Sequence, residues 1–312
     1  MSLFLLKRLI QAFFIVIGVT LVTFALFHLV GGDPALHYAG KNASAETIQS
    51  LRHELGLDQS TLYQYGLFLK QTFTWDWGHS WANRRSVSQL VYEHLGASLS
   101  LTVPAYLLSV LVALLFALLA AVNQGGRVDR YLLNLCFVFM SFSFVVYVVF
   151  AQKVFAFDLH LFPVYGWNPS WTGRWPYVFL PCLIYAFAHL PAKILLFRAS
   201  LFQELQQDYV RTARAKGLAT ATVYSVHILK NTALPILTLV MSQLPTLLTG
   251  SVLLEAYFGI PGLGGLLLKS IQSNDLPVIK ALTVLGSLFS ISFQFLHDVL
   301  AAALDRRWEL SS

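Results

Sequence analysis

Six long apolar stretches constrain this 312-residue chain more than any other feature of its sequence. An α-helix rises about 1.5 Å per residue, so about 20 apolar residues are needed to cross the roughly 30 Å hydrocarbon layer of a bilayer. A segment in that layer has to satisfy its backbone hydrogen bonds internally, which a helix does. We therefore predict an all-α integral membrane protein with six transmembrane helices, at about 9–30, 99–122, 131–151, 176–197, 233–254 and 278–304.

The composition agrees with a membrane protein. Hydrophobic residues make up 56% of the chain and charged residues only 12%, whereas about 25% of a typical soluble domain is charged. The formal net charge is +6, but the basic residues lie at the ends of apolar stretches and form no single patch, so we predict no nucleic-acid partner. Cys136 and Cys182 lie in apolar stretches without CxxC spacing. We interpret both as packing residues and predict no metal site.

The basic residues also predict the orientation of the spans, because Lys and Arg near span ends stay on the cytoplasmic side. Six spans place most of them on one side, namely Lys7, Arg8, Arg127, Arg130, Arg198, Arg211, Arg214, Lys216, Lys230, Arg306 and Arg307. The opposite short loops contain Lys153, Arg174, Lys269 and Lys280. We therefore predict that both termini are cytoplasmic. The first span is too long for a signal peptide and no small-residue cleavage site follows it, so we expect it to be retained.

The connection 31–96 is predicted to be a small helical insertion on the external side. Apolar residues recur at helical spacing over 45–55, Gly56 provides a stop, and a second helical piece at 62–70 leads into the aromatic cluster FTWDWGHSW. Two interpretations of Trp75, Trp77 and Trp81 stay open. They lie either at the headgroup level of the membrane or in a small hydrophobic core of the insertion.

The segment 208–235, DYVRTARAKGLATATVYSVHILKNTALP, is a basic block between two apolar stretches. Good helix formers run from 209 to 216, with Asp208 as N-cap or first-turn acid and Gly217 as C-cap. A second helix is expected to begin near 220–222 and to continue into Pro235. The predicted result is a helix, a tight turn and a helix on the cytoplasmic side, with Ala213 and Gly217 leaving one flank small.

Composition alone allows two interpretations of this block, a loop resting on anionic lipid or a docking surface. The residues favour docking, because DYVRTARAKGL, followed by HILKN and LP, resembles the cytoplasmic loop of bacterial ATP-binding-cassette importer permeases. The general form of that loop has Glu-Ala-Ala where this chain has Arg211, Thr212 and Ala213, and then a Gly and a Leu-Pro. The version here is similar to the one typical of the peptide and nickel branch.

The resemblance extends over nearly the whole chain. It is carried early by LKRL, GDPA at 32–35, LGLD at 55–58, QYG at 64–66 and GHS at 78–80, and late by LLEAYFGIPGLGGLLLKSI, NDLPVIK and ALDRR. Two places depart from the family pattern. Trp75-Asp76-Trp77 replaces the usual Gly-Asp pair, and GASLSL at 96–101 replaces a Pro-Ala-Thr-Leu-Glu type run. Both lie on the external side and bear on the substrate class more than on the architecture.

The resemblance implies a permease subunit in the bacterial inner membrane that binds no cofactor itself. Two separate ATPase subunits would use ATP and Mg²⁺, because GLGGLLLKS at 262–270 lacks the Gly directly before Lys of a phosphate-binding loop. The resemblance also implies a second permease and an external binding protein as partners. It favours a paralogue of this chain over a second copy as that second permease. The implied division is a first helix at 1–30, the insertion at 31–96 and a permease core at 97–312 with a docking loop at 200–232. The implied ATPase-docking residues are Asp208, Tyr209, Arg211, Ala213, Arg214, Gly217 and Leu218.

Few ionisable residues lie within the apolar stretches, where each costs roughly 2.5–3.5 kcal/mol on insertion scales. One of them closes the fifth stretch and resembles the start of the family's Glu-x-x-Phe-x-x-Pro-Gly pattern. That pattern implies an outer gate formed by Glu255, Phe258, Pro261, Gly262 and Gly264, and the alternative is an interfacial re-entrant turn with a structural Glu. His189 and Lys193, one turn apart in the fourth stretch, either line the pathway or snorkel towards the cytoplasm, and we favour the structural role. His297 and Asp298 are interpreted as a local polar pair.

The sequence thus predicts a permease subunit of an ATP-driven importer of peptides, with nickel or a metal chelate as the alternative substrate. An ion-coupled secondary transporter would show internal repeats with paired broken helices and buried acids, which this sequence does not show. An enzyme would need a nucleophile with a base, or a metal-ligand cluster such as HExxH, and neither is found. We therefore predict that the chain is not an enzyme.

Overall fold

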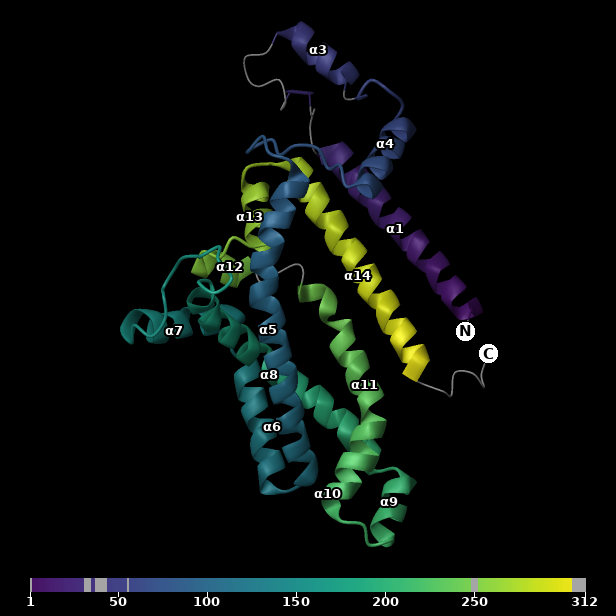
Figure 1. The fold of residues 1–312 in the computed structure, drawn as a ribbon, viewed down its shortest axis with the longest axis vertical. Helices are drawn as coiled ribbons and strands as arrows, with labels where there is room; N and C mark the ends of the chain where they lie inside the picture. Colours follow the sequence, from purple (N-terminus) through teal and green to yellow (C-terminus); the bar gives the residue numbers. More distant parts are fainter. Residues whose placement is uncertain (1, 31–34, 37–43, 55, 248–251, 305–312) are drawn as a thin grey trace.

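The computed structural model describes residues 2–30, 35–36, 44–54, 56–247 and 252–304, and it is helical with no β-strand among the elements in those ranges. The chain forms an elongated bundle, with helix α3 (Ala45–Glu54) at one end and helices α9 (Asp208–Ala215) and α10 (Thr220–Thr222) at the opposite end (Figure 1). Most of the GDPA motif, Leu55 of LGLD, and Arg306 and Arg307 lie outside the described residues.

Five helical segments are each long and apolar enough to cross a membrane unbroken. They are α1 (Ser2–Val30), α5 (Val87–Val122), α8 (Trp175–Leu205), α14 (Leu276–Leu304), and the run of α10 with a π-helical η2 (Val223–Ile228) and α11 (Leu229–Ser242). Two further apolar segments are bent pairs, so the described residues contain five spans, or up to seven if each pair is one span. The all-α membrane architecture is confirmed, whereas the count of six stays a prediction.

The expected third span, 131–151, is divided in two. Helix α6 (Arg127–Met140) ends at a bend of 88°, beyond which α7 (Phe144–Ala151) runs into a π-helical η1 (Gln152–Asp158). The bend exposes backbone carbonyls that side chains then satisfy: the Tyr147 hydroxyl donates to the Phe139 carbonyl at 2.5 Å, and the Ser141 hydroxyl to the Phe137 carbonyl at 2.9 Å. Hydropathy does not register this break, because the residues on both sides of it are apolar.

The expected fifth span, 233–254, also differs from the structure. Helix α11 ends at Ser242 and a short 3₁₀ turn, η3 (Leu244–Leu247), follows it. Pro245 has no backbone N–H and cannot continue the ladder of an α-helix. The apolar run that crosses the bundle here begins at Thr220 instead. Glu255 therefore does not close the fifth span but lies in a separate short helix, α12 (Val252–Phe258).

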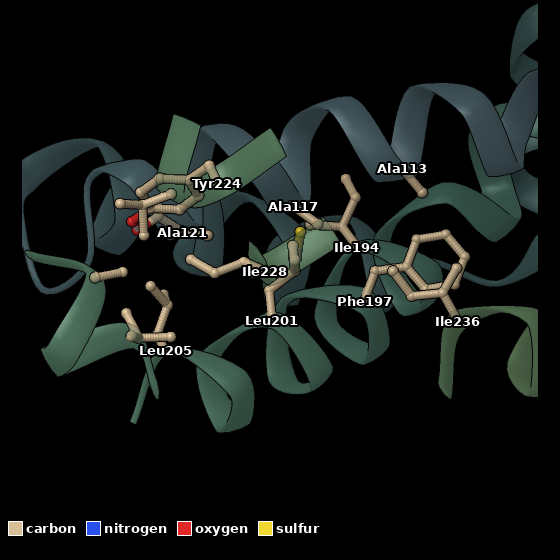
Figure 2. Packing of buried hydrophobic residues seen from close by; sticks show 14 residues of the cluster. Ala113, Ala117, Ala121, Ile194, Phe197, Leu201, Leu205, Tyr224, Ile228 and Ile236 are labelled. Carbon is tan, nitrogen blue, oxygen red and sulfur yellow. Dashed lines mark hydrogen bonds between the residues drawn. The ribbon is translucent and has the colours of Figure 1, made fainter. Parts of the chain in front are cut away.

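A seam of small residues on α5 holds the bundle together. Every fourth residue of α5 is almost fully buried, with at most 3% exposure, over the series Ala97, Leu101, Ala105, Ser109, Ala113, Ala117 and Ala121. Small side chains let two helix backbones approach closely, which is the usual basis of helix packing in lipid. Helix α8 lies against this seam, and Figure 2 shows Ile194, Phe197 and Leu201 of α8 facing its alanines.

The insertion before α5 is helical as expected. It contains α3 and α4 (Thr61–Thr74), and α4 contacts α1 through Tyr65, whose hydroxyl lies 3.0 Å from the Thr20 hydroxyl. Trp77 is buried in a cluster with Leu263, Leu266 and Val278, which favours the small-core interpretation for this residue. Trp75 is 56% exposed and lies outside that cluster.

The two ends of the bundle give a direct test of orientation. Ser50 in α3 and Thr220 in α10 are both exposed and lie at opposite ends (Figure 1). A 36-residue helix such as α5 is about 54 Å long, enough to separate the two faces of a membrane. We expect a membrane-impermeant maleimide to label the S50C variant in intact spheroplasts and the T220C variant only after lysis.

The native chain is the control for this labelling, because Cys136 and Cys182 are both buried and should stay unlabelled. Labelling of both variants from the same side would contradict the predicted orientation.

Candidate functional site

Two groups of predicted site residues lie in different parts of the bundle. The first is the basic turn, defined as Asp208–Leu218. The second is the bent hairpin, which is α12 and α13 (Leu263–Gln272), joined at 86°. Figure 1 places α9 at one tip of the molecule and the bent hairpin closer to the end that carries α3.

The basic turn has the predicted helix–turn–helix form. Asp208 is the first residue of α9, where its negative charge faces the positive end of the helix dipole. The helix closes with hydrogen bonds from the Lys216 amide to the Thr212 carbonyl at 3.0 Å and from the Gly217 amide to the Arg214 carbonyl at 3.0 Å. Gly217 has a φ of +75°, which an L side chain adopts only at a cost.

The side chains of the basic turn divide into an inner and an outer set. Val210 and Ala213 point inward and are at most 5% exposed. The outer set is exposed and comprises Asp208, Arg211, Thr212, Arg214, Ala215, Lys216, Gly217 and Leu218. The sequence predicts that Ala213 and Gly217 form one small outer flank of the turn, and for Ala213 this prediction is wrong. Ala213 packs against the bundle beneath the exposed residues, whereas Gly217 is exposed.

The inner set anchors α9 to the bundle. Val210 and Ala213 belong to one buried cluster with Leu205 of α8, Val223 of η2 and Ala121 of α5. The Tyr224 hydroxyl, also in this cluster, donates a 2.8 Å hydrogen bond to the backbone carbonyl of α5 at its last turn, at Ala121. A force on α9 would therefore reach α5 and α8 directly, because packed side chains resist compression.

Tyr209 forms a second anchor at the start of α9. Its hydroxyl donates to the Glu204 carboxylate at 2.5 Å. Burial and the hydrogen bond to Glu204 both raise the pKa of the Tyr209 hydroxyl, so it stays protonated and keeps donating. Tyr209 is half-buried, and its role in the basic turn is to fix α9 to the end of α8.

A third contact braces the same end of the bundle. The Arg198 guanidinium of α8 forms a two-point ion pair with the Asp129 carboxylate of α6, at 2.6 Å and 2.8 Å. Asp129 also accepts from the Gly125 amide at 3.1 Å in the α5–α6 turn. Two-point Arg–carboxylate pairs are directional and strong. This pair therefore fixes α6 and the α5–α6 turn relative to α8, and Asp129 is a residue that the sequence analysis missed.

The bent hairpin is organised around the buried Glu255 carboxylate. One carboxylate oxygen accepts from the Ser98 hydroxyl of α5 at 2.7 Å, and the other accepts from the Gly265 amide at 2.7 Å. Ser98 in turn accepts from the Leu263 amide at 2.7 Å. Glu255, directly and through Ser98, therefore caps the first turn of α13, where free N–H groups and the helix dipole favour an anion. A structural role for Glu255 is thus evident from its partners.

The glycines beside Glu255 leave room for its side chain. A Cβ added at Gly262 would collide with the Glu255 carboxyl group, and one at Gly264 would lie 2.9 Å from a methyl carbon of Val252. Phe258 is 2% exposed and Pro261 is half-buried at the bend. The five predicted residues Glu255, Phe258, Pro261, Gly262 and Gly264 therefore do lie together.

The bent hairpin is fastened to the insertion by Asp275, which the sequence analysis did not single out. Its buried carboxylate accepts from the Ser80 hydroxyl, from the Trp81 amide at 3.0 Å and from the Ala82 amide at 3.4 Å. Asp275 immediately precedes α14. An acid directly before an apolar Leu-Pro helix start is an N-cap signal that could have identified it.

Other predicted polar residues have specific partners. Asp298 pairs with Arg8 at 3.1 Å as well as with its neighbour His297 at 3.3 Å, so it joins α14 to α1. The expectation that Lys193 snorkels is wrong, because its side chain is only 3% exposed. Within the described ranges, no three His, Cys, Asp or Glu side chains form a group that could hold a metal ion.

Comparison with known proteins covers nearly the whole chain. Residues 113–310 match the family described as "Binding-protein-dependent transport system inner membrane component", and residues 1–102 match "Binding-prot-dependent transport system membrane comp, N-term". A Brucella abortus protein named as a peptide transport system permease protein is 34% identical over 311 residues, 98% of this chain and 99% of its own. The glutathione transport system permease protein of Salmonella typhimurium is 33% identical over 303 residues, 97% of each chain.

The packing at Gly262 yields a stability prediction. We expect Gly262→Ala to destabilise the protein by about 1–3 kcal/mol, because the added methyl group has to displace the hydrogen-bonded Glu255 carboxyl group. Gly66→Ala is the matched control. Gly66 is exposed within α4 and has nothing within 4 Å of an added Cβ, so the change should be neutral or stabilising by up to about 1 kcal/mol.

The measurement is the Tm of the detergent-purified protein, which is determined from the loss of its monodisperse size-exclusion peak on heating. Equal Tm values for Gly262→Ala and the native protein would contradict the proposed packing of Glu255.

Proposed function

The chain belongs to the family of binding-protein-dependent transport system inner membrane components, and from this premise we propose that it is one permease subunit of an ATP-driven peptide importer. In this proposal the chain provides half of a translocation pathway through the bacterial inner membrane. A second permease provides the other half, two ATPase subunits use ATP and Mg²⁺, and an external binding protein delivers the substrate.

The basic turn is the feature that supports the proposed coupling of this chain to an ATPase. An exposed surface of charged and small side chains stands on α9, which is anchored through Val210 and Ala213 in the α5–α8 core. A surface that transmits a mechanical step has to be accessible on one side and rigid on the other. The basic turn has both properties, and Leu218, 41% exposed, adds apolar area to it.

The names of the relatives support a proposal for the substrate class. Those reported above are named for peptide and for glutathione transport, and glutathione is itself a small peptide. We therefore propose a short peptide as the substrate. Reconstitution of the chain with its partner subunits in proteoliposomes tests this directly. ATP-dependent uptake of a radiolabelled tripeptide supports the proposal, and uptake that does not depend on ATP contradicts it.

The bent hairpin is proposed to act at the external closure of the pathway. Its bend of 86° lies between two short helices, and non-helical backbone at membrane depth is tolerated only against protein or a water-filled path. Glu255 holds the bend in its present form through Ser98 and Gly265. A change in the position of α13 would have to break or carry along these hydrogen bonds.

A bulky residue at Gly217 should uncouple the ATPase. Gly217 is exposed, and an added Cβ meets nothing within 4 Å, so Gly217→Trp fills the docking surface without disturbing the inner packing of α9. We expect ATP-dependent uptake to fall to background, because a large side chain forced into a packed contact costs about 1–3 kcal/mol or prevents docking. The amount of ATPase that copurifies through a tag on this chain should fall in parallel.

Gly125→Trp is the matched control for that variant. Gly125 lies in the α5–α6 turn at the same end of the bundle, has a φ of +71° against +75° at Gly217, and is equally open around its Cα. The backbone strain and the added bulk are therefore similar in both variants. Full ATPase recovery with Gly217→Trp, or equal loss with Gly125→Trp, would contradict docking at the basic turn.

A further inference from the structure

Lys193 is a buried cation in the middle of a membrane-spanning helix. It lies 12 residues before the end of α8 at Leu205 and 18 residues after its start at Trp175, which is about 18 Å and 27 Å along the helix axis. Its side chain is 3% exposed. A position at this depth costs energy for any charged group, so its partners decide what the residue does.

The contacts of Lys193 come from α5. Its ammonium donates a 2.7 Å hydrogen bond to the Ser109 hydroxyl and lies 4.6 Å from the centre of the Tyr106 ring. Ser109 donates its own proton to the Tyr106 carbonyl at 2.8 Å, and the Tyr106 hydroxyl donates to the Val240 carbonyl of α11 at 2.6 Å. Three helices therefore fix the direction of the ammonium, while both hydroxyl protons are already used.

No carboxylate neutralises this cation within the part of the chain that the structure describes. Two other cations of the long apolar helices do have such a partner: Arg198 has Asp129, and Arg8 has Asp298. A Lys ammonium has three N–H donors, and Ser109 is its one hydrogen-bond acceptor among the described residues. Lys193 thus keeps two N–H donors for an anion that the described residues do not supply.

An apolar cavity of about 790 Å³ lies next to this cluster. It is bounded by α5, α6, α7 and α8, and its walls include Ser109, Leu190, Phe139, Phe187 and Tyr147. Lys193 does not itself line the cavity, but its ammonium is hydrogen-bonded to Ser109, which is one of the lining residues. Entry of the ammonium into that space requires the long, flexible Lys stem to change its rotamer.

We propose that Lys193, held by Ser109 and Tyr106, binds the free carboxylate of a substrate during its passage through the membrane. This inference rests on the proposed function in taking a peptide as the substrate. The apolar walls of the cavity would accept substrate side chains of varied shape, and the ammonium would supply the one fixed charge contact. An ion pair in a low-dielectric site is strong enough to select a free carboxylate over a neutral amide.

The first test compares trialanine with trialanine amide in proteoliposomes that contain the complete transporter. We expect Lys193→Met to lower the uptake of trialanine at least tenfold and to leave the uptake of the amide unchanged. Lys193→Arg should retain much of the preference for trialanine over its amide. Lys280→Met is the matched control. Lys280 is a second cation in a membrane-spanning helix that contacts an aromatic ring, at 5.5 Å from Phe27, and its removal should leave the preference for the free acid as it is.

The second test needs no transport. We expect N-acetylglycine, which has a carboxylate, to raise the Tm of the purified native complex, and N-acetylglycinamide to have no such effect. The Lys193→Met complex should respond to neither. This result supports the carboxylate site even if the native complex imports no peptide, an outcome that would refute the proposed function alone.

Two results would overturn the inference. An equal rise in Tm with N-acetylglycine in the native and Lys193→Met complexes would place the carboxylate elsewhere. Loss of the second permease from the purified Lys193→Met complex would indicate that Lys193 forms an ion pair with an acidic residue of that partner chain and not with a substrate.

Discussion

The close packing of α8 on the small-residue seam of α5 is the contact on which the rest of the bundle depends. In lipid, helices gain little from hiding apolar surface, so their association relies on close van der Waals packing. Buried residues at every fourth position, alanines except for Leu101 and Ser109, let α8 approach α5 along most of its length. The anchoring cluster under α9 and the contacts of Lys193 follow from that approach, because both join α8 or its neighbours to α5. The ion pair of α8 with α6 then fixes α6 beside them.

Each buried charge in the bundle is held by groups that the backbone places around it. Glu255 of α12 lies against the first turn of α13, where it accepts from the Gly265 amide and the Ser98 hydroxyl. Asp275, directly before α14, accepts from the Ser80 hydroxyl and from the Trp81 and Ala82 amides of the insertion. Asp129 has a guanidinium instead. These acids stabilise bends and helix starts, and removing one partner would leave a buried charge uncompensated. Lys193 differs because its contacts are a hydroxyl and a ring face.

The two ends of the protein are connected through continuous packed elements. At one end, the inner side chains of α9 contact α5, α8 and η2. At the other, Asp275 and the Trp77 cluster join the insertion to α13 and α14. Helix α5 belongs to both regions, since Ser98 near its start holds Glu255 and Ala121 near its end accepts from Tyr224. A displacement of α9 and a displacement of the insertion would therefore both act on α5, which gives the proposed transporter one physical route between its ends.

The sequence by itself determined the all-α membrane class, the form of the basic turn with Gly217 at its end, and the family resemblance, because hydropathy, helix formers and glycine act locally along the chain. It also indicated the grouping of Glu255 with the glycines that follow it. Only the tertiary structure decided that the third apolar stretch bends at Ser141, that Ala213 faces inward, and that Lys193 is enclosed. Those outcomes depend on partners far apart in the chain, such as Ser109 for Lys193 and Ser98 for Glu255. Local pattern does not record which side chain will satisfy a buried polar group, since that choice is made by the packing of helices against one another.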